Sequence, residues 1–138
     1  MSEALTEAHI AFNKGEVPVG AVIVKDGEII ARGHNQREEK QNALSHAEIE
    51  CINEACKKLG SWRLDGCKMY VTLEPCPMCA AACRWSQIGR VVWGADDPKG
   101  GFRRYSESLL HPKTVAQNGL MAEECAELMK KFFSELRN

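Results

Sequence analysis

The sequence predicts a three-layer α/β/α domain built around a mixed sheet of about five strands. Short β-branched segments alternate with amphipathic ones along the chain, two of the strand segments are joined by hairpin-turn residues, and two later ones flank a helical segment. A hairpin gives antiparallel strands and a strand–helix–strand unit gives parallel ones, so the sheet is expected to be mixed. We find no linker or repeat, and expect one domain over residues 1–138.

The composition is that of a soluble globular protein, with 44% hydrophobic and 27% charged residues. No apolar run approaches the length of a membrane span, and the first residues lack the pattern of a signal peptide. We therefore expect a cytoplasmic protein without a membrane partner, whose seven cysteines are ligands or core residues. A net charge of −1 gives no global attraction to nucleic acid, so any such contact needs a local patch.

The first part of the chain is expected to form a helix and then an antiparallel hairpin. Residues 3–12 place apolar side chains at helical spacing. Residues 17–24 form a β-branched run, 25–28 carry turn residues, and 29–33 return as a second strand. Pro18 has no N–H for a sheet ladder, so it belongs at the start of its strand or on an edge.

A polar loop then leads into a second helix. Asn35 lies in this loop, where it either caps a turn or offers its amide to a ligand at the mouth of a site. Ser45 is the expected N-cap of the helix, with Glu48 at the capping-box position, and an apolar stripe continues to about Gly60. Glu48 is thus either a helix cap or a functional carboxylate.

The second half of the chain is expected to alternate strands and helices. Residues 67–73 alternate as a third strand, 77–86 read as an alanine-rich helix, and 90–95 suit a central strand. Residues 96–101 then form a loop at the carboxyl end of that strand, where ligands of open α/β sheets collect. Residues 123–136 close the chain as an amphipathic helix.

Phe102-Arg103-Arg104-Tyr105 combines two cations with two aromatic rings. Such a pairing is suited to stacking on bases and holding phosphates. The alternative is a solvated loop that folds back on the core, which is the usual fate of charged surface segments. The sequence leaves both interpretations open.

The most specific pattern is His46, with Glu48 two residues later, together with Cys76 and Cys79. Two thiolates and one imidazole are the ligands of a catalytic zinc that keeps its fourth position open for water. Both cysteines fall in the first turn of the helix expected at 77–86, where backbone N–H groups favour thiolates. The signature H-x-E…P-C-x-x-C is that of zinc nucleobase deaminases, in which the glutamate is the general acid and base. We expect one Zn²⁺ per chain, with Glu48 as the catalytic residue.

Two other classes of protein use part of this pattern. Cys83, one turn beyond Cys79, is either a core residue or a fourth ligand that would make the site a closed structural zinc module. A dithiol redox protein would use Cys76 and Cys79 without metal, leaving His46 and Glu48 without a role.

These residues resemble the cytidine deaminase-like superfamily and, within it, the tRNA-specific adenosine deaminases. The resemblance covers nearly the whole chain, and besides the two zinc motifs it rests on residues 16–22, 33–35, 73–75, 94–99 and 119–125. It implies the cytidine deaminase-like fold, a homodimer, and hydrolytic replacement of the exocyclic amine of a nucleobase, as in wobble adenosine-to-inosine conversion. It also implies that His46, Cys76 and Cys79 bind zinc while Glu48 shuttles protons.

By the same resemblance, Asn35 contacts the substrate sugar or base, and the backbone of Ala47 touches the base. The remaining residues expected to bind substrate are Val19, Pro75, Asp97, Lys99 and Phe102.

The chain departs from the family pattern between residues 102 and 113. Members that act on tRNA usually carry a Gly-Ser pair after the D-P-K loop, and Phe102-Arg103-Arg104-Tyr105 stands in that region of this chain. They also carry an Asn-His pair before the last strand, where this chain is several residues shorter. Relatives that deaminate free guanine, cytosine, adenine or other small bases share the zinc motifs. The expected substrate is therefore a tRNA anticodon loop or, alternatively, a free base or nucleoside.

Overall fold

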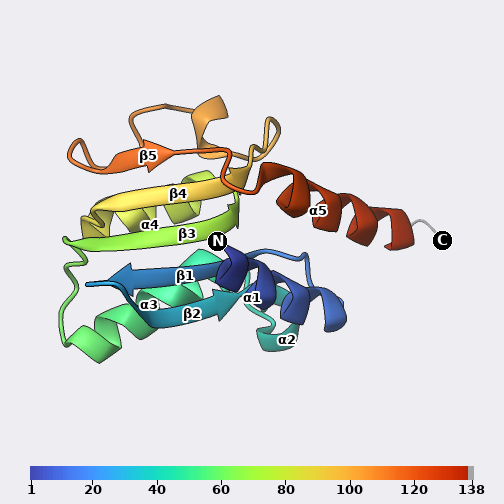
Figure 1. Cartoon of the computed structure of the whole chain (residues 1–138), viewed down its shortest axis with the longest axis horizontal. Coiled ribbons are helices and arrows are strands. Elements are labelled where there is room, and N and C mark those ends of the chain that lie inside the picture. Colours follow the sequence, from blue (N-terminus) through green and yellow to red (C-terminus); the bar gives the residue numbers. More distant parts are fainter. Residues whose placement is uncertain (137–138) are drawn as a thin grey trace.

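The computed structural model describes residues 1–136 of the chain. Its strands form one five-stranded sheet in the order β2-β1-β3-β4-β5 (Figure 1), so the expected number of strands is confirmed. The strands are Gly20–Lys25 (β1), Glu28–His34 (β2), Cys67–Leu73 (β3), Arg90–Ala95 (β4) and Val115–Gln117 (β5). The last two residues of the expected domain, 1–138, lie outside the described part of the chain.

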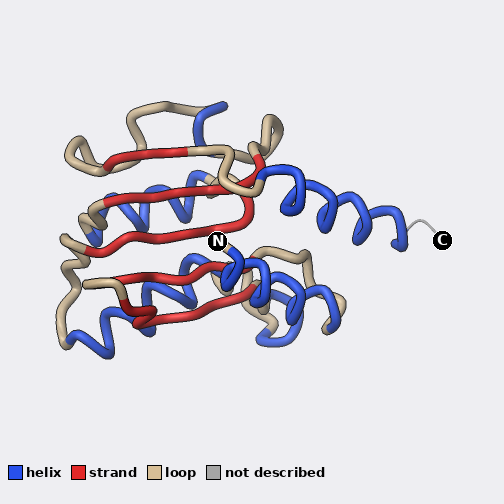
Figure 2. Tube along the Cα trace, in the orientation of Figure 1, coloured by secondary structure: helices blue, strands red, loops and turns tan. Residues whose placement is uncertain are grey.

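Helices cover both faces of this sheet and give the three predicted layers. The helices are α1 (Ser2–Asn13), α2 (Arg37–Lys40), α3 (Ala47–Leu59), α4 (Pro77–Ser86), the 3-10 turn η1 (Phe102–Arg104) and α5 (Ala122–Leu136). α1 and α5 lie on one face, and α3 and α4 on the other (Figure 1 and Figure 2). Among the helices of residues 1–136, none is long and apolar enough to cross a membrane.

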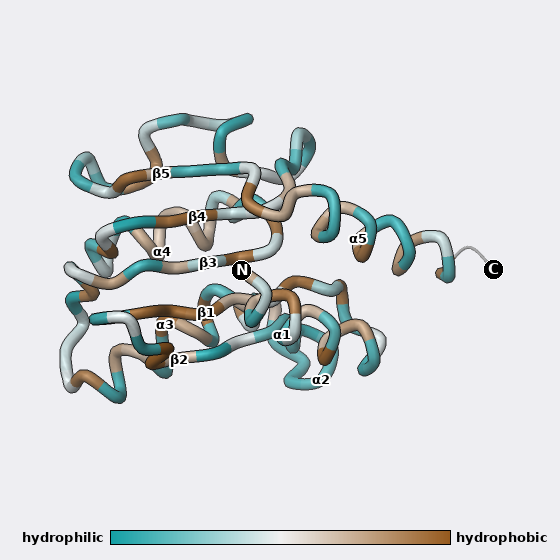
Figure 3. The backbone as a smooth tube through the Cα atoms, in the orientation of Figure 1, coloured by the Kyte–Doolittle hydropathy of each residue, from teal (hydrophilic) through white to brown (hydrophobic). Residues whose placement is uncertain are grey.

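Two apolar clusters hold the layers together. The larger cluster joins α3 and α4 to the sheet around Ile23, Met69 and Val91, and the smaller one joins α1 to α5 through Leu5 and Leu128. Figure 3 shows hydrophobic residues along β1 and β4, and hydrophilic ones along the exposed helix α2. Burial of this apolar surface is the main term that favours the fold.

The sheet is mixed, as predicted. β1 pairs antiparallel with both β2 and β3, whereas β3–β4 and β4–β5 are parallel pairs. The strands that flank each motif helix run in the same direction, but only β3 and β4 are direct neighbours, because the hairpin brings β1 between β2 and β3. The carboxyl ends of β3 and β4 therefore meet at one edge, beside the start of α4.

Two glycines let helices approach the sheet more closely than a side chain would allow. A Cβ at Gly20 would lie 2.1 Å from the backbone oxygen of Ala4 in α1, and one at Gly33 would lie 2.5 Å from that of Ala47 in α3. Ordinary contacts of carbon atoms are about 3.5–4.0 Å. Gly33 thus fixes how near the amino-terminal end of α3, which carries the histidine motif, lies to β2.

The start of α3 differs from the prediction. His46, and not Ser45, is the N-cap, and it makes no side-chain cap hydrogen bond. Ser45 is buried, and its carbonyl accepts a hydrogen bond from the Gln36 N–H at 2.9 Å. A capping box needs a serine or threonine at the N-cap, so the predicted capping box of Ser45 and Glu48 is wrong.

Part of the expected polar loop forms the short helix α2. Its N–H groups at Glu38 and Glu39 donate to the buried carboxylate of Glu16, at 3.1 and 2.7 Å. A carboxylate at the amino-terminal end of a helix satisfies its free N–H groups and complements its dipole. Glu16 therefore holds the segment between the hairpin and α3 in place.

Candidate metal centre and active site

The three predicted metal ligands come from the starts of two neighbouring helices. His46 is the N-cap of α3 and Cys76 the N-cap of α4, and both have extended backbones, with ψ of 156° and 169°. Pro77 occupies the first turn of α4, a position that tolerates its missing N–H. Cys79 follows one turn into α4 and is fully buried.

The ligand atoms have the spacing that zinc requires. His46 Nδ1 lies 3.6 Å from Cys76 Sγ and 3.5 Å from Cys79 Sγ. In a tetrahedral site with Zn–S of about 2.3 Å and Zn–N of about 2.0–2.1 Å, a nitrogen and a sulfur ligand lie about 3.6 Å apart. All three ligand atoms lie within 4.8 Å of one another. The chain therefore presents three corners of a zinc tetrahedron.

The protonation states of these residues also favour a cation. A hydrogen bond from the Cys79 thiol, together with one from His46, lowers the pKa of Cys76 to about 4. The hydrogen bond to Cys76 raises the pKa of Cys79, because the Cys79 thiol must keep its proton to donate it. Burial raises this pKa further. The hydrogen bond to Cys76 raises the pKa of His46. One thiolate thus forms even without metal, and a bound cation would favour loss of the second thiol proton.

Cys83 does not join this cluster. It is fully buried in the larger apolar cluster, and burial raises the pKa of its thiol. Within residues 1–136, the group that could hold a metal is His46, Cys76 and Cys79. The described residues therefore offer three candidate ligands, the number that a catalytic zinc uses, and not the four of a closed structural module.

Glu48 is buried beside the ligands, in the first turn of α3. Burial raises the pKa of its carboxyl group to about 7, despite an opposing backbone hydrogen bond. A carboxyl group with a pKa near neutrality can both accept and release a proton at physiological pH. Glu48 is therefore suited to general acid and base catalysis.

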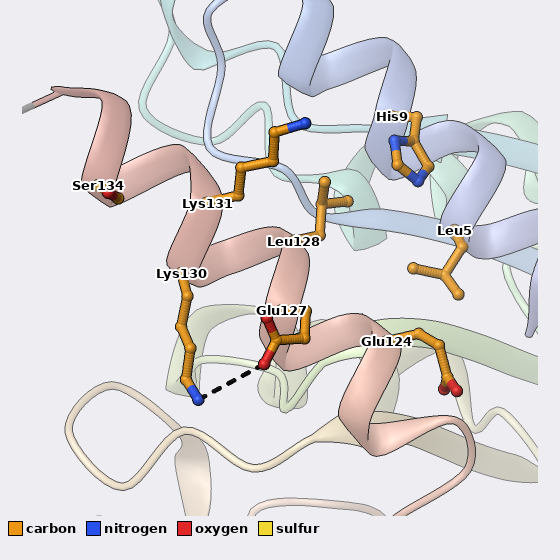
Figure 4. A pocket seen from close by; sticks show the side chains of 8 residues that line it. All are labelled: Leu5, His9, Glu124, Glu127, Leu128, Lys130, Lys131 and Ser134. Atoms are coloured by element: carbon orange, nitrogen blue, oxygen red, sulfur yellow. Dashed lines mark ion pairs between the residues drawn. The ribbon is translucent and has the colours of Figure 1, made fainter.

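A cavity of about 190 Å³ opens over this cluster. His46, Glu48 and Cys76 line it, and so do four of the residues expected to bind substrate, which are Val19, Asn35, Ala47 and Asp97. A larger groove of about 680 Å³ lies between α1 and α5 (Figure 4). Its lining contains none of the predicted site residues, so the smaller cavity is the candidate active site.

Asn35 caps the loop, as one of its two interpretations predicted. Its side-chain N–H donates to the Val17 carbonyl at 3.3 Å, and its side-chain oxygen accepts from the Arg37 N–H at 3.4 Å. It nevertheless lines the cavity, together with Arg37, which the sequence did not single out. No local signal separates Arg37 from other charged loop residues, since its position depends on α2.

Three expected substrate-binding residues do not line the cavity. Pro75 is fully buried, and Phe102 is only 2% exposed. The Phe102 ring packs edge-on against Trp93 with 5.6 Å between centroids, and its N–H donates to the Pro75 carbonyl at 2.8 Å. Lys99 is exposed on the loop after β4. Phe102 thus supports the wall of the cavity from behind.

The segment after this loop also folds back on the core. Arg103 pairs with the carboxylates of Glu74 and Asp96, at 3.0 and 2.8 Å. Arg104 and Tyr105 are exposed, and Arg104 donates to the Lys99 carbonyl at 3.2 Å. Sequence reasoning missed Glu74, although a charged residue at the carboxyl end of a buried strand, directly before the ligand turn, was a usable signal.

Known proteins resemble this chain over nearly its whole length. Residues 1–137 match the MafB19-like deaminase family. The tRNA-specific adenosine deaminase of Bacillus subtilis (strain 168) is 51% identical over 99% of this chain and 88% of its own length. A structure from studies of A-to-I editing by tRNA:A34 deaminases is 46% identical, with a TM-score of 0.87 over 93% of this chain and 96% of its own. The guanine deaminase from Bacillus subtilis is 43% identical, with a TM-score of 0.66 over 69% of this chain and 61% of its own.

The sequence identity, the five-stranded mixed sheet and the His-Cys-Cys cluster all indicate the same deaminase family. The fold is therefore the cytidine deaminase-like fold that the motifs implied. The chain belongs to the tRNA-specific adenosine deaminase family of the cytidine deaminase-like superfamily, and it is a hydrolytic deaminase.

Proposed function

We propose that this protein converts the wobble adenosine of tRNA to inosine, with zinc as its cofactor. The observation that carries the proposal is the cluster of His46, Cys76 and Cys79 beside buried Glu48. It occurs in a chain 51% identical, over 99% of its length, to a tRNA-specific adenosine deaminase. Neither a redox dithiol nor a structural zinc module would need the buried carboxylate.

His46, Cys76 and Cys79 would hold one zinc ion per chain. When bound, zinc supplies a Lewis acid that lowers the pKa of a water from that of bulk toward about 7. Three protein ligands leave the fourth position of a tetrahedral ion to that water.

Glu48 moves the protons of the reaction. It accepts a proton from the attacking water and donates it to the ring nitrogen next to the amine-bearing carbon of adenine. It then carries the second water proton to the departing amine, which leaves as ammonia while the ring carbon keeps the water oxygen. The carboxylate returns to its starting state, and a pKa of about 7 suits both transfers.

The residues that line the cavity would hold the base. We assign the side chain of Asn35 to the sugar or base and the backbone of Ala47 to the base edge, with Val19 and Asp97 as opposing walls. Buried Pro75 and Phe102 would support the wall that contains Asp97. Exposed Lys99 would face the phosphates of the substrate. A flipped-out base that lies between such groups is read by its edge and by stacking.

A free base, foremost guanine, is the second candidate substrate. The guanine deaminase from Bacillus subtilis is 43% identical to this chain. In addition, Phe102 and Arg103, which belong to the segment that departs from the family pattern, are engaged with the protein itself. That segment consequently offers less contact to nucleic acid than its composition suggests.

Mass spectrometry of the products separates the two candidates. The zinc-loaded protein is incubated with a tRNA that carries adenosine at the wobble position, with the same tRNA carrying guanosine there, and with free guanine, adenine and cytosine. Inosine at the wobble position, with no turnover of free bases, supports the proposal. Conversion of free guanine with tRNA unchanged would replace it by the second candidate. Glu48→Gln serves as the blank.

We also propose a cytoplasmic homodimer. Trp62 and Trp85 are 59% and 78% exposed, and Leu44 and Tyr105 are also exposed. Large apolar side chains of this kind are frequent in interfaces between protein chains. Light scattering after size exclusion should give the mass of two chains, and the mass of one chain at micromolar concentration would contradict the dimer.

A further inference from the structure

Glu74 is a buried carboxylate with three hydrogen bonds, all from the segment after β4. Its side chain is 2% exposed and directly follows β3. One oxygen accepts from the Asp97 N–H at 3.1 Å and from Arg103 Nη2 at 3.0 Å, and the other accepts from the Arg103 N–H at 3.1 Å. The carboxylate thus joins β3 to two points of a loop that follows it by more than twenty residues.

Arg103 is fixed from its other side as well. Its Nη2 also pairs with Asp96 at 2.8 Å, and the guanidinium lies over the Trp93 ring, 5.1 Å from the centroid. The Trp93 Nε1–H donates to the same Asp96 oxygen at 2.8 Å. Arg103 is therefore held by two carboxylates and an aromatic face.

The loop reaches Glu74 only because residue 101 is glycine. A Cβ at Gly101 would lie 2.3 Å from the Glu74 carboxylate and 2.6 Å from the Asp97 carbonyl oxygen. Its φ of −72° is ordinary, so the requirement is for space and not for backbone freedom. Both the charge pair and this close approach keep the loop against the end of β3.

This loop supplies part of the cavity wall, because Asp97 and Gly100 both line the cavity. We propose that Glu74 and Arg103 form a clamp that fixes residues 97–103 as this wall, with Glu74 a positioning residue that sets the affinity for substrate. The statement on affinity rests on the proposed function, whereas the clamp itself does not. Glu74 itself also lines the cavity, but both of its carboxylate oxygens are engaged by Asp97 and Arg103, so it acts through the loop.

Three substitutions weaken the clamp by different means. Glu74→Gln removes the charge, Arg103→Ala removes its partner, and Gly101→Ala pushes the loop away by contact. Glu107→Gln is the matched control, because Glu107 is an exposed carboxylate on the same segment.

For each clamp variant we expect KM to rise by about 10-fold or more, with kcat changed by less than about 3-fold, because Glu48 and the metal ligands are untouched. Zinc content should stay at that of the wild type and of Glu107→Gln. The effects of Glu74→Gln and Arg103→Ala should not add in the double variant. Loss of zinc, or a fall in kcat at constant KM, would overturn the assignment of Glu74 as a residue that sets affinity.

Hydrogen exchange tests the clamp without any substrate. The amides of Asp97 and Arg103 should exchange faster in all three clamp variants and at the wild-type rate in Glu107→Gln. Unchanged protection in Glu74→Gln would overturn the clamp. If the wild-type protein fails to deaminate tRNA while the variants lose this protection, the proposed function fails and the clamp stands.

Discussion

Replacing Gly33 by alanine is expected to weaken zinc binding, because the added methyl group meets the first turn of α3. The new Cβ would lie 2.5 Å from the Ala47 backbone oxygen and 2.9 Å from the Cys51 nitrogen. Ordinary contact begins near 3.4 Å, so α3 must retreat from β2 by about 0.9 Å. Zinc ligands tolerate deviations of about 0.2 Å. His46 directly precedes this turn and must move with it.

The magnitude follows from two effects. Overpacking of this kind costs about 1–3 kcal/mol of folding free energy, which lowers the thermal midpoint of a domain of this size by about 3–10 °C. Displacement of a ligand's support typically lowers metal affinity by about 10-fold to 100-fold. Competition with a chromogenic chelator measures the affinity, and a thermal melt measures the stability.

Gly60→Ala is the matched control, since Gly60 is the C-cap of the same helix. Its φ of +64° makes alanine unfavourable there, but nothing lies within 4 Å of the added Cβ. The left-handed conformation costs about 1–2 kcal/mol for a residue with a Cβ, so Gly60→Ala should lower stability and leave zinc affinity unchanged. Wild-type zinc affinity in Gly33→Ala would refute the reasoning.

Three further substitutions test individual residues. Glu48→Gln should retain zinc and lower kcat by about 100-fold to 10,000-fold, and turnover at the wild-type rate would exclude Glu48 as the proton carrier. Cys83→Ser should keep one zinc per chain by elemental analysis while Cys79→Ser loses it; release of zinc from Cys83→Ser would instead favour a structural module. Phe102→Ala should lower the free energy of unfolding in urea by about 3–5 kcal/mol, because it empties a core position beside Trp93. A rise in KM without loss of stability would mean that Phe102 contacts the substrate.

The sequence predicted those elements whose pattern is local. The helix Pro77–Ser86 and the strands Cys67–Leu73 and Arg90–Ala95 have the bounds that residue patterning predicted. Proline residues, alternation of apolar and polar residues, and runs of β-branched residues determine structure over a few residues. They can therefore be read from a single sequence. The N-cap of α3 was predicted one residue too early, at Ser45, because the burial of Ser45 and the bond from the Gln36 N–H to its carbonyl are tertiary features that local patterning does not display.

The metal ligands were predictable for a different reason. Few side chains bind zinc, and the motifs H-x-E and C-x-x-C that carry them are short enough to be recognised in the sequence alone. In contrast, Glu74 and Arg103 are 29 residues apart, and nothing in the sequence says that they pair. The sequence also does not show where Phe102 lies. Its aromatic ring suited stacking on a base, but the residue is buried in the core.

We propose that the cavity at His46, Glu48 and Cys76 carries out the hydrolytic deamination of tRNA. The most direct measurement is mass spectrometry of nucleosides from wobble-adenosine tRNA, after reaction in water enriched in heavy oxygen, with ammonia measured in parallel. The mechanism predicts one heavy oxygen in each inosine and one ammonia per turnover, both lost in Glu48→Gln. Inosine without heavy oxygen, or an unaltered tRNA in the presence of fully zinc-loaded protein, would contradict it.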